Sequence, residues 1–213
     1  MKLSRRKFFC NTISAGLLFS LPVPVLAKRP PVNDNPDDIF EIIKSRRSVR
    51  KFKPDPVPKE VLIKILEAAN YAPSPRNRQD WKFLVIDDRE IISHIREECI
   101  RNSGEESRQY FTDYLSAPVY VVILANTSTH NPENDILAGA LASENLFLAA
   151  RALGYGTVFC ANSIPEEITR QVLNIPENYR RLCITPIGIP AEWPQCPEKK
   201  NIEEVICYNS IFK

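Results

Sequence analysis

Apolar side chains recur at intervals of three and four residues along 37–47 and again along 58–72. This spacing places them on one face of a helix, so both segments are predicted to be amphipathic helices. The sequence predicts further helices at 89–102, 105–116 and 165–175. We expect the first two of these three to lie on the outside of a sheet.

The segment 134–154 differs because it is apolar on nearly every side and carries small residues along one stripe. Such a helix is buried on several sides, and this one could lie at the centre of a dimer. Short runs rich in β-branched and aromatic residues predict strands near 82–87 and 119–125, and at 156–160 and 180–190. Helices and strands therefore alternate irregularly. No G-x-G-x-x-G turn follows a strand, so the dinucleotide-binding fingerprint is absent.

The N-terminus, residues 1–27, has another pattern. Residues 1–12 carry four cations and no acid, an apolar run follows, and the small residue Ala27 ends it. This is the layout of an export signal. Pro22 and Pro24 interrupt the apolar run, which is too short to span a bilayer of about 30 Å comfortably. We expect a signal peptide over 1–27, with a membrane tether by an uncleaved signal as the alternative.

The pair Arg5 and Arg6, in the run SRRKFF, resembles the twin-arginine export motif. That motif serves proteins that fold before they cross the membrane, so we expect export to the periplasm. The prolines and short polar residues of 28–36 predict a linker or arm. Residues 37–213 are predicted to form one domain, and 44% hydrophobic content is enough for a sizeable core.

Charge and cysteine content exclude several classes of protein. The net charge is +2, and loss of the four cations in 1–27 leaves 24 basic against 26 acidic residues, a net charge of −2. A nucleic-acid binder would need a sustained basic surface, so nucleic acid is not an expected partner. The six cysteines form no Cys-x-x-Cys pair, so no metal site is expected. Most are expected to be small buried hydrophobic residues. Whether any two of them form a disulfide is left open by the sequence.

Four residues with anion-binding chemistry follow the first helix: Arg46, Arg47, Ser48 and Arg50. Cations at a helix C-terminus stabilise it by about 0.3–1 kcal/mol each, which accounts for one or two arginines. Alternate residues of an extended segment point to the same side, so Ser48 and Arg50 can face one ligand. Arg46 and Arg47 could bind a phosphate through charge-assisted hydrogen bonds. Further donors are available at Lys199 and Lys200.

Several ordered motifs together resemble the nitroreductase family of FMN-dependent flavoproteins, and the resemblance covers residues 38–206. The motifs are RRSVRKF, LEAANYAPSPRNRQDWKFLVID, AGALASENLFLAARALGYGT, PIGIP and KKNIEEV. The resemblance implies an α+β fold: a three-layer sandwich with a mostly antiparallel central sheet flanked by helices. It also implies a homodimer with two FMN molecules at the subunit interface.

The resemblance assigns cofactor contacts to residues of this chain. Arg46 and Arg47 correspond to contacts with the FMN phosphate and ribityl chain, and Ser48 and Arg50 to contacts with the pyrimidine edge of the flavin. Lys199 and Lys200 correspond to the final phosphate-binding cations.

Two loops complete this assignment. Pro73, Ser74, Pro75 and Asn77 correspond to a loop that reaches the FMN of the partner subunit. Cys160, Ala161 and Asn162, with Phe159 before them, correspond to the backbone that passes over the reactive flavin nitrogen. The chain departs from the family pattern at Pro75, where serine is frequent, and at Ala161 and Asn162, where many relatives carry an acid and a glycine.

The expected function is an FMN-dependent oxidoreductase that reduces a small nitroaromatic or quinone-like acceptor in a flavin ping-pong cycle. No side chain is expected to be catalytic, because the flavin carries the chemistry. Arg50 would stabilise the negative charge that collects at the pyrimidine edge on reduction. The electron donor stays open between NAD(P)H, usual in the family, and a membrane or periplasmic carrier. The alternative is a non-catalytic flavin- or ligand-binding protein of the same fold.

Overall fold

The structure is a computed structural model of the chain, and it describes residues 37–211. The expected signal over 1–27 and the arm over 28–36 lie outside the described residues. The described helices are α1 (Asp37–Ser45), α2 (Lys59–Asn70), α3 (Arg89–Ser103), α4 (Arg108–Tyr114), α5 (Pro132–Ala152) and α6 (Glu166–Val172). The strands are β1 (Trp81–Ile86), β2 (Val119–Asn126) and β3 (Tyr179–Ile187). Single 3-10 turns are η1 (Pro75–Asn77), η2 (Glu105–Ser107) and η3 (Ile202–Glu204).

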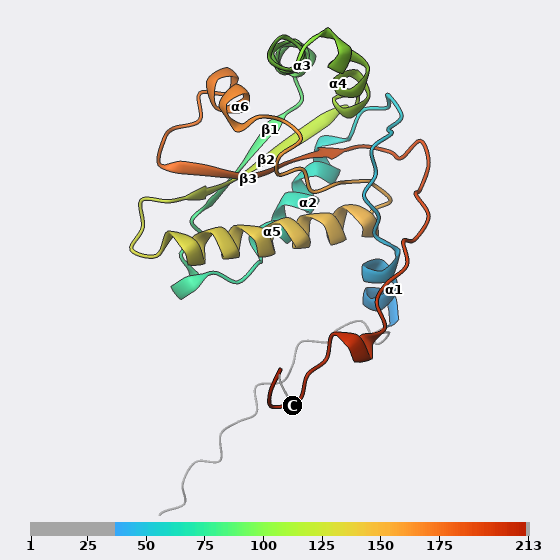
Figure 1. Cartoon of the computed structure of the whole chain (residues 1–213), viewed down its shortest axis with the longest axis vertical. Coiled ribbons are helices and arrows are strands. Elements are labelled where there is room, and N and C mark those ends of the chain that lie inside the picture. Colours follow the sequence, from blue (N-terminus) through green and yellow to red (C-terminus); the bar gives the residue numbers. More distant parts are fainter. Residues whose placement is uncertain (1–36, 212–213) are drawn as a thin grey trace, which may run out of the picture. The chain divides into compact units, whose positions relative to one another are not determined.

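The three strands form an antiparallel sheet in the order β1-β2-β3. Helices α3, α4 and α6 cover one face, and α2 and α5 cover the other (Figure 1). The strand β2 is buried along almost its whole length, because both of its faces lie under helices. The expected α+β three-layer sandwich with an antiparallel sheet is therefore confirmed.

Each face of the sheet has its own apolar core, and alternate residues of β2 enter one or the other. Tyr120, Val122 and Leu124 pack with α3, α4 and α6. Val121 and Ile123 pack with α2 and α5. This two-faced burial explains why β2 is a continuous apolar run and not an alternating one.

The helix ends agree with elementary capping rules. The Asp88 side chain accepts a hydrogen bond from the Glu90 N–H at 2.8 Å and caps α3, and Asn131 caps α5 in the same way just before Pro132. The helix α6 ends at Val172, shorter than expected, and Asn174 follows it with a left-handed φ of 51°. Among the described residues, no helix combines the length and apolarity needed to cross a membrane.

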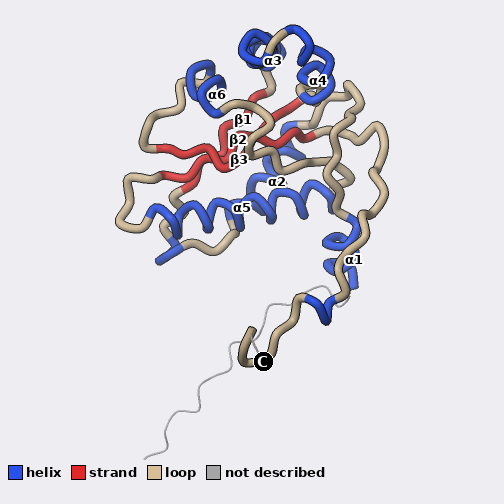
Figure 2. Tube along the Cα trace, viewed as in Figure 1, coloured by secondary structure: helices blue, strands red, loops and turns tan. Residues whose placement is uncertain are grey.

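One strand prediction was wrong. The segment 156–160 makes only isolated bridges, which pair Gly156 with Gly188, Thr157 with Ser48 and Cys160 with Ile184. Its successive residues face different partners, so no continuous ladder forms. The segment instead joins the end of the sheet to the residues that follow α1. Figure 2 draws the connection from α5 to α6, which contains this segment, as loop.

Candidate functional site

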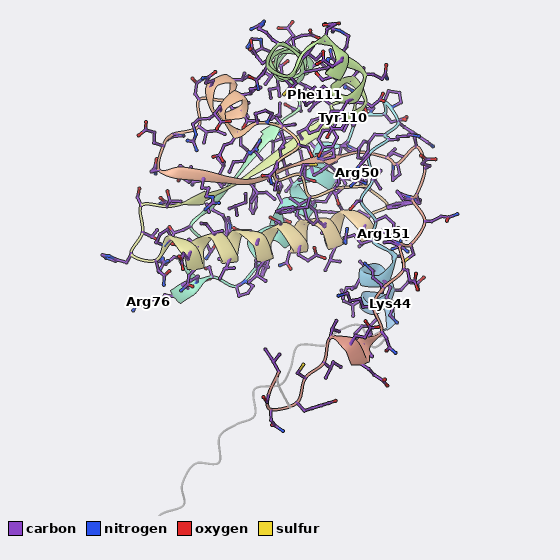
Figure 3. The ribbon with its side chains drawn as sticks, in the orientation of Figure 1. Lys44, Arg50, Arg76, Tyr110, Phe111 and Arg151 are labelled. Atoms are coloured by element: carbon purple, nitrogen blue, oxygen red, sulfur yellow. The ribbon has the colours of Figure 1, made fainter. Side chains whose placement is uncertain are left out.

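The predicted anion-binding residues lie in the extended segment that follows α1, residues 46–50, which we call the arginine segment. The Val49 N–H donates to the Thr157 carbonyl at 2.9 Å, and Ser48 forms a parallel bridge with the same threonine. Val49 is fully buried, whereas its neighbours Ser48 and Arg50 are partly or wholly exposed. The expected alternation is therefore present. In Figure 3 the Arg50 side chain lies close to the end of the sheet.

The arginines of this segment carry more positive charge than their surroundings neutralise. Arg46 has one weak partner, Glu144, with the two charged groups 3.7 Å apart. Arg47 donates to the carbonyls of Lys44 at 2.6 Å and Arg46 at 2.7 Å. Among residues 37–211, no carboxylate lies within ion-pair distance of Arg47 or Arg50. An anion with several oxygens would complement this surplus.

The loop that follows Thr157 lies beside Arg50. Cys160 is buried, and burial raises the pKa of its thiol, while a hydrogen bond from Tyr114 and the charge of Arg50 oppose that rise. The ring of Phe159 is 48% exposed. A groove of about 450 Å³ lies against this loop; its lining includes Phe159, Asn162 and Arg181, but none of residues 46–50. The structure thus brings the arginine segment and the predicted flavin loop together.

Arg151, at the C-terminal end of α5, fixes the position of the arginine segment. Its Nε donates to the Ser45 hydroxyl at 3.0 Å, and its guanidinium carbon lies 4.4 Å from the centre of the Trp193 ring. Lys51 and Glu192 form an ion pair at 3.2 Å nearby. These contacts join the start of the C-terminal arm, residues 191–211, to the end of α1. Arg151 could not be predicted from the sequence, because nothing in a helical pattern marks a cation–π partner far along the chain.

Lys199 and Lys200 lie in the C-terminal arm, in a shallow hollow lined also by Glu198, Asn201 and Glu204. No described contact joins either lysine to Arg46 or Arg47. Their role in phosphate binding stays a prediction.

The loop 73–77 lies far from the arginine segment within one chain. Figure 3 places Arg76 of this loop at one end of α5 and Arg50 toward the other. Pro73, Ser74, Pro75 and Asn77 therefore do not reach the arginines of their own chain. That they serve a partner subunit stays a prediction.

The same loop is held in an unusual backbone conformation. Three residues that are not glycine have left-handed φ values of 54°, 56° and 55°: Arg76, Asn77 and Gln79. Such conformations cost roughly 1–3 kcal/mol each and persist only where the surroundings enforce them. Arg78 supplies part of that enforcement, since it pairs with Asp80 at 2.7 Å and with buried Asp135 at 2.5 Å. The loop is thus pinned to the start of α5.

The residues present fit FMN. The guanidinium groups of Arg47, without a described carboxylate partner, and Arg46, with only a weak one, suit its phosphate, and Arg50 lies where it can face a flavin edge near the 159–162 loop. Free thiols occur at Cys99, Cys160, Cys183, Cys196 and Cys207, the first three of them buried as expected. No cluster of three or more His, Cys, Asp or Glu side chains that could hold a metal ion occurs in the described part of the chain.

Gly156 controls how closely the arginine segment approaches the sheet, a role that sequence reasoning missed. A Cβ at Gly156 would lie 2.8 Å from the Val49 Cβ, well inside van der Waals contact. We expect Gly156→Ala to lower the free energy of unfolding by about 1–3 kcal/mol, because overpacking pushes the two segments apart. Urea denaturation measures this. In a double-mutant cycle, Val49→Ala should relieve part of the cost; fully additive losses would contradict the proposed contact.

Comparisons with known proteins identify the family of this chain. The Nitroreductase family model matches residues 43–189. A protein of Methanothermobacter thermautotrophicus, provisionally named an NADH dehydrogenase/NAD(P)H nitroreductase, is 34% identical over 161 residues, which cover 74% of this chain and 80% of that protein.

Solved structures of this kind show the same fold. The FMN-dependent nitroreductase of Clostridium difficile superposes with a TM-score of 0.65 at 28% identity, covering 80% of this chain and 99% of its own. An iodotyrosine deiodinase bound to FMN and 3-iodo-L-tyrosine gives 0.69 at 25% identity, covering 82% of this chain and 100% of its own. The cofactor expected for the family, FMN, is thus the one named with these structures. The chain belongs to the nitroreductase family.

Proposed function

We propose that this protein is an FMN-dependent oxidoreductase that reduces a small nitroaromatic or quinone-like acceptor. The observation that carries the proposal is the surplus of positive charge at Arg46, Arg47 and Arg50 beside the loop 159–162. FMN, when bound, supplies two-electron redox chemistry that protein side chains lack. The family membership and the FMN-containing relatives support the same conclusion.

The residues of the chain have distinct roles in this proposal. Arg46 and Arg47 hold the phosphate, and Ser48 and Arg50 orient the pyrimidine edge of the ring. The positive charge of Arg50 favours negative charge at that edge, in the way that oriented donors stabilise an oxyanion. Backbone N–H groups of Ala161 and Asn162 can serve as donors whatever their side chains are. The departures from the family pattern at these two positions therefore leave the proposal intact.

We further propose that the protein functions as a homodimer, with the loop 73–77 of each subunit completing the site of the other. The apolar face of a single chain supports this. Helices α1 and α5 expose large apolar side chains, and a groove between them and the end of α2 is lined by large and small apolar residues and one asparagine (Ile39, Ile42, Ala68, Tyr71, Asn145, Leu148, Ala149, Ala152). Contiguous apolar surface of this kind marks an association site.

The enzyme and the flavin-binding alternative differ in turnover. Purified protein is reduced without oxygen by dithionite or NADH, and a nitroaromatic compound or a quinone is then added. For an enzyme, the 450 nm band is lost on reduction and recovers on addition of acceptor, many times over with donor in excess. A flavin band that never recovers faster than that of free FMN would support the flavin-binding protein instead. NAD(P)H is the first donor to test, since relatives carry it in their names.

We propose, finally, that the folded, FMN-loaded protein is exported to the periplasm. Arg5→Lys with Arg6→Lys retains the charge of the N-terminus but removes the twin arginines. We expect this double variant to remain in the cytoplasm as a soluble yellow precursor, while the wild type reaches the periplasm without residues 1–27. Immunoblots of the two fractions measure the outcome. Equal export of both forms would contradict the twin-arginine route.

A further inference from the structure

An irregularity in the sheet turns Arg181 toward the predicted flavin loop. In the β2–β3 pairing, Ile123 faces Cys183 but the next residue, Leu124, faces Arg181, so Leu182 is an extra residue in a bulge. A bulge shifts the alternation of a strand by one position. Cys183 accordingly packs with α2 and α5, whereas Arg181, two residues earlier, lies on the opposite face, under α6 and the loop before it.

The Arg181 guanidinium donates hydrogen bonds to the loop 161–164 and to α6. Its Nη2 donates to the carbonyl oxygens of Ala161 at 2.9 Å and Ile164 at 2.6 Å, and its Nη1 donates to the Thr169 hydroxyl at 3.2 Å. The two carbonyls bracket Asn162 and Ser163. These bonds fix the direction of the peptide groups at the two ends of this short stretch, and therefore the direction in which its N–H groups point.

Arg181 is buried without an ion-pair partner. It is 6% exposed, and among the described buried side-chain atoms its Nε has no hydrogen-bond partner. No described carboxylate lies within ion-pair distance; Glu166 accepts from the Arg181 backbone N–H at 3.4 Å and from the Arg170 side chain at 2.8 Å. Burial lowers the pKa of Arg181, and the more distant charge of Glu166 opposes this.

Hydrogen bonds to carbonyl oxygens require a donor but not a charge. A buried charge without a partner is costly, and a neutral donor at this position would avoid that cost. A fixed positive charge bonded to the loop favours negative charge close to it. The charges of Arg50 and Arg181 both oppose the rise in the pKa of the Cys160 thiol, which directly precedes Ala161 in this loop.

We infer that Arg181 is a positioning residue for the redox reaction: it fixes the loop 161–164 and adds a buried positive charge that makes bound FMN easier to reduce. This inference rests on the proposed function. Arg181 acts through the loop and through its charge, and it is not assigned a contact with the cofactor.

The test compares Arg181→Met, Arg181→Lys and the control Arg170→Met. Arg170 is an arginine of the same region that also bonds backbone carbonyls, those of Ile175, Pro176 and Tyr179, but none in the loop, and that differs from Arg181 in being ion-paired with Glu166 at 2.8 Å. In Arg181→Met we expect the ratio of reduced to oxidised FMN affinity to fall about tenfold, which equals a potential more negative by about 30 mV for a two-electron couple. Arg181→Lys should have a reduction potential close to that of wild type. Arg170→Met should lose stability but keep the potential.

Hydrogen exchange of the FMN-free protein gives a second readout. Lysine keeps the positive charge but lacks the planar guanidinium that donates to several acceptors at once. The amides of 161–164 should therefore exchange roughly tenfold faster in Arg181→Lys than in wild type. This measurement also decides the matter if Arg181→Met does not fold. An Arg181→Met potential equal to that of wild type, or unchanged exchange in Arg181→Lys, would overturn the inference. Wild-type protein that binds no FMN at all would instead reject the proposed function.

Discussion

The variant Leu141→Glu is expected to be a folded monomer that has lost its FMN. Leu141 lies on the outer face of α5, one turn from Leu137, and these side chains are 50% and 62% exposed in the single chain. A glutamate there is well solvated in the monomer and suits a helix. In a dimer it would be buried without a partner, at a cost of about 3 kcal/mol or more, which is over a hundredfold in dissociation constant. Analytical ultracentrifugation and flavin absorbance together measure the result.

The matched control is Ile91→Glu. Ile91 is 37% exposed on α3, which covers the opposite face of the sheet. The same change there should leave the protein dimeric and yellow. A Leu141→Glu variant that is monomeric yet retains its full FMN would show that one chain holds the cofactor alone. It would thereby contradict the proposed role of the partner's loop.

Arg46→Ala is expected to weaken FMN binding by roughly ten- to a hundredfold. A hydrogen bond to a charged group is worth about 1.5–3 kcal/mol, and Arg46 has only the weak Glu144 contact to compensate for a lost phosphate. The double change Arg46→Ala with Arg47→Ala should lose more, because no described carboxylate neutralises Arg47. Isothermal titration of the FMN-free protein with FMN measures the affinity of both variants. Raised salt should narrow the difference in FMN affinity between wild type and each variant.

Lys51→Ala serves as the control for loss of charge in the same segment. Lys51 is exposed and already paired with Glu192. Its removal should change FMN affinity by less than about twofold, since exposed pairs contribute little. An Arg46→Ala variant that binds FMN as tightly as Lys51→Ala would remove the basis of the phosphate assignment.

The layout of the fold could be predicted from sequence because it depends on local patterns. The apolar spacing of α2 and the β-branched runs of β1 and β2 depend only on which residues must be buried, and the structure confirmed these elements. The segment 156–160 was misjudged as a strand for the opposite reason. Whether its residues form a ladder depends on three partners far away in the chain, Ser48, Ile184 and Gly188.

The site was predictable where residue chemistry is unusual and unpredictable where geometry decides. Three arginines around one serine stand out in any sequence. Arg181 does not, because the strand pattern alone assigns it to the face of Cys183, and only the bulge at Leu182 reverses that assignment. Nothing in the sequence marks Gly156 either, because the need for glycine there comes from the close approach of Val49. Residues that act through a neighbour therefore had to come from the structure.

The absorption spectrum of the purified full-length protein tests the central claim most directly. The account predicts a yellow protein with flavin bands near 370 and 450 nm, about one FMN released per chain on denaturation, and loss of the 450 nm band on anaerobic reduction. Apoprotein prepared from it should regain the same bands when FMN is added. A colourless, folded protein that also fails to bind added FMN would contradict the account.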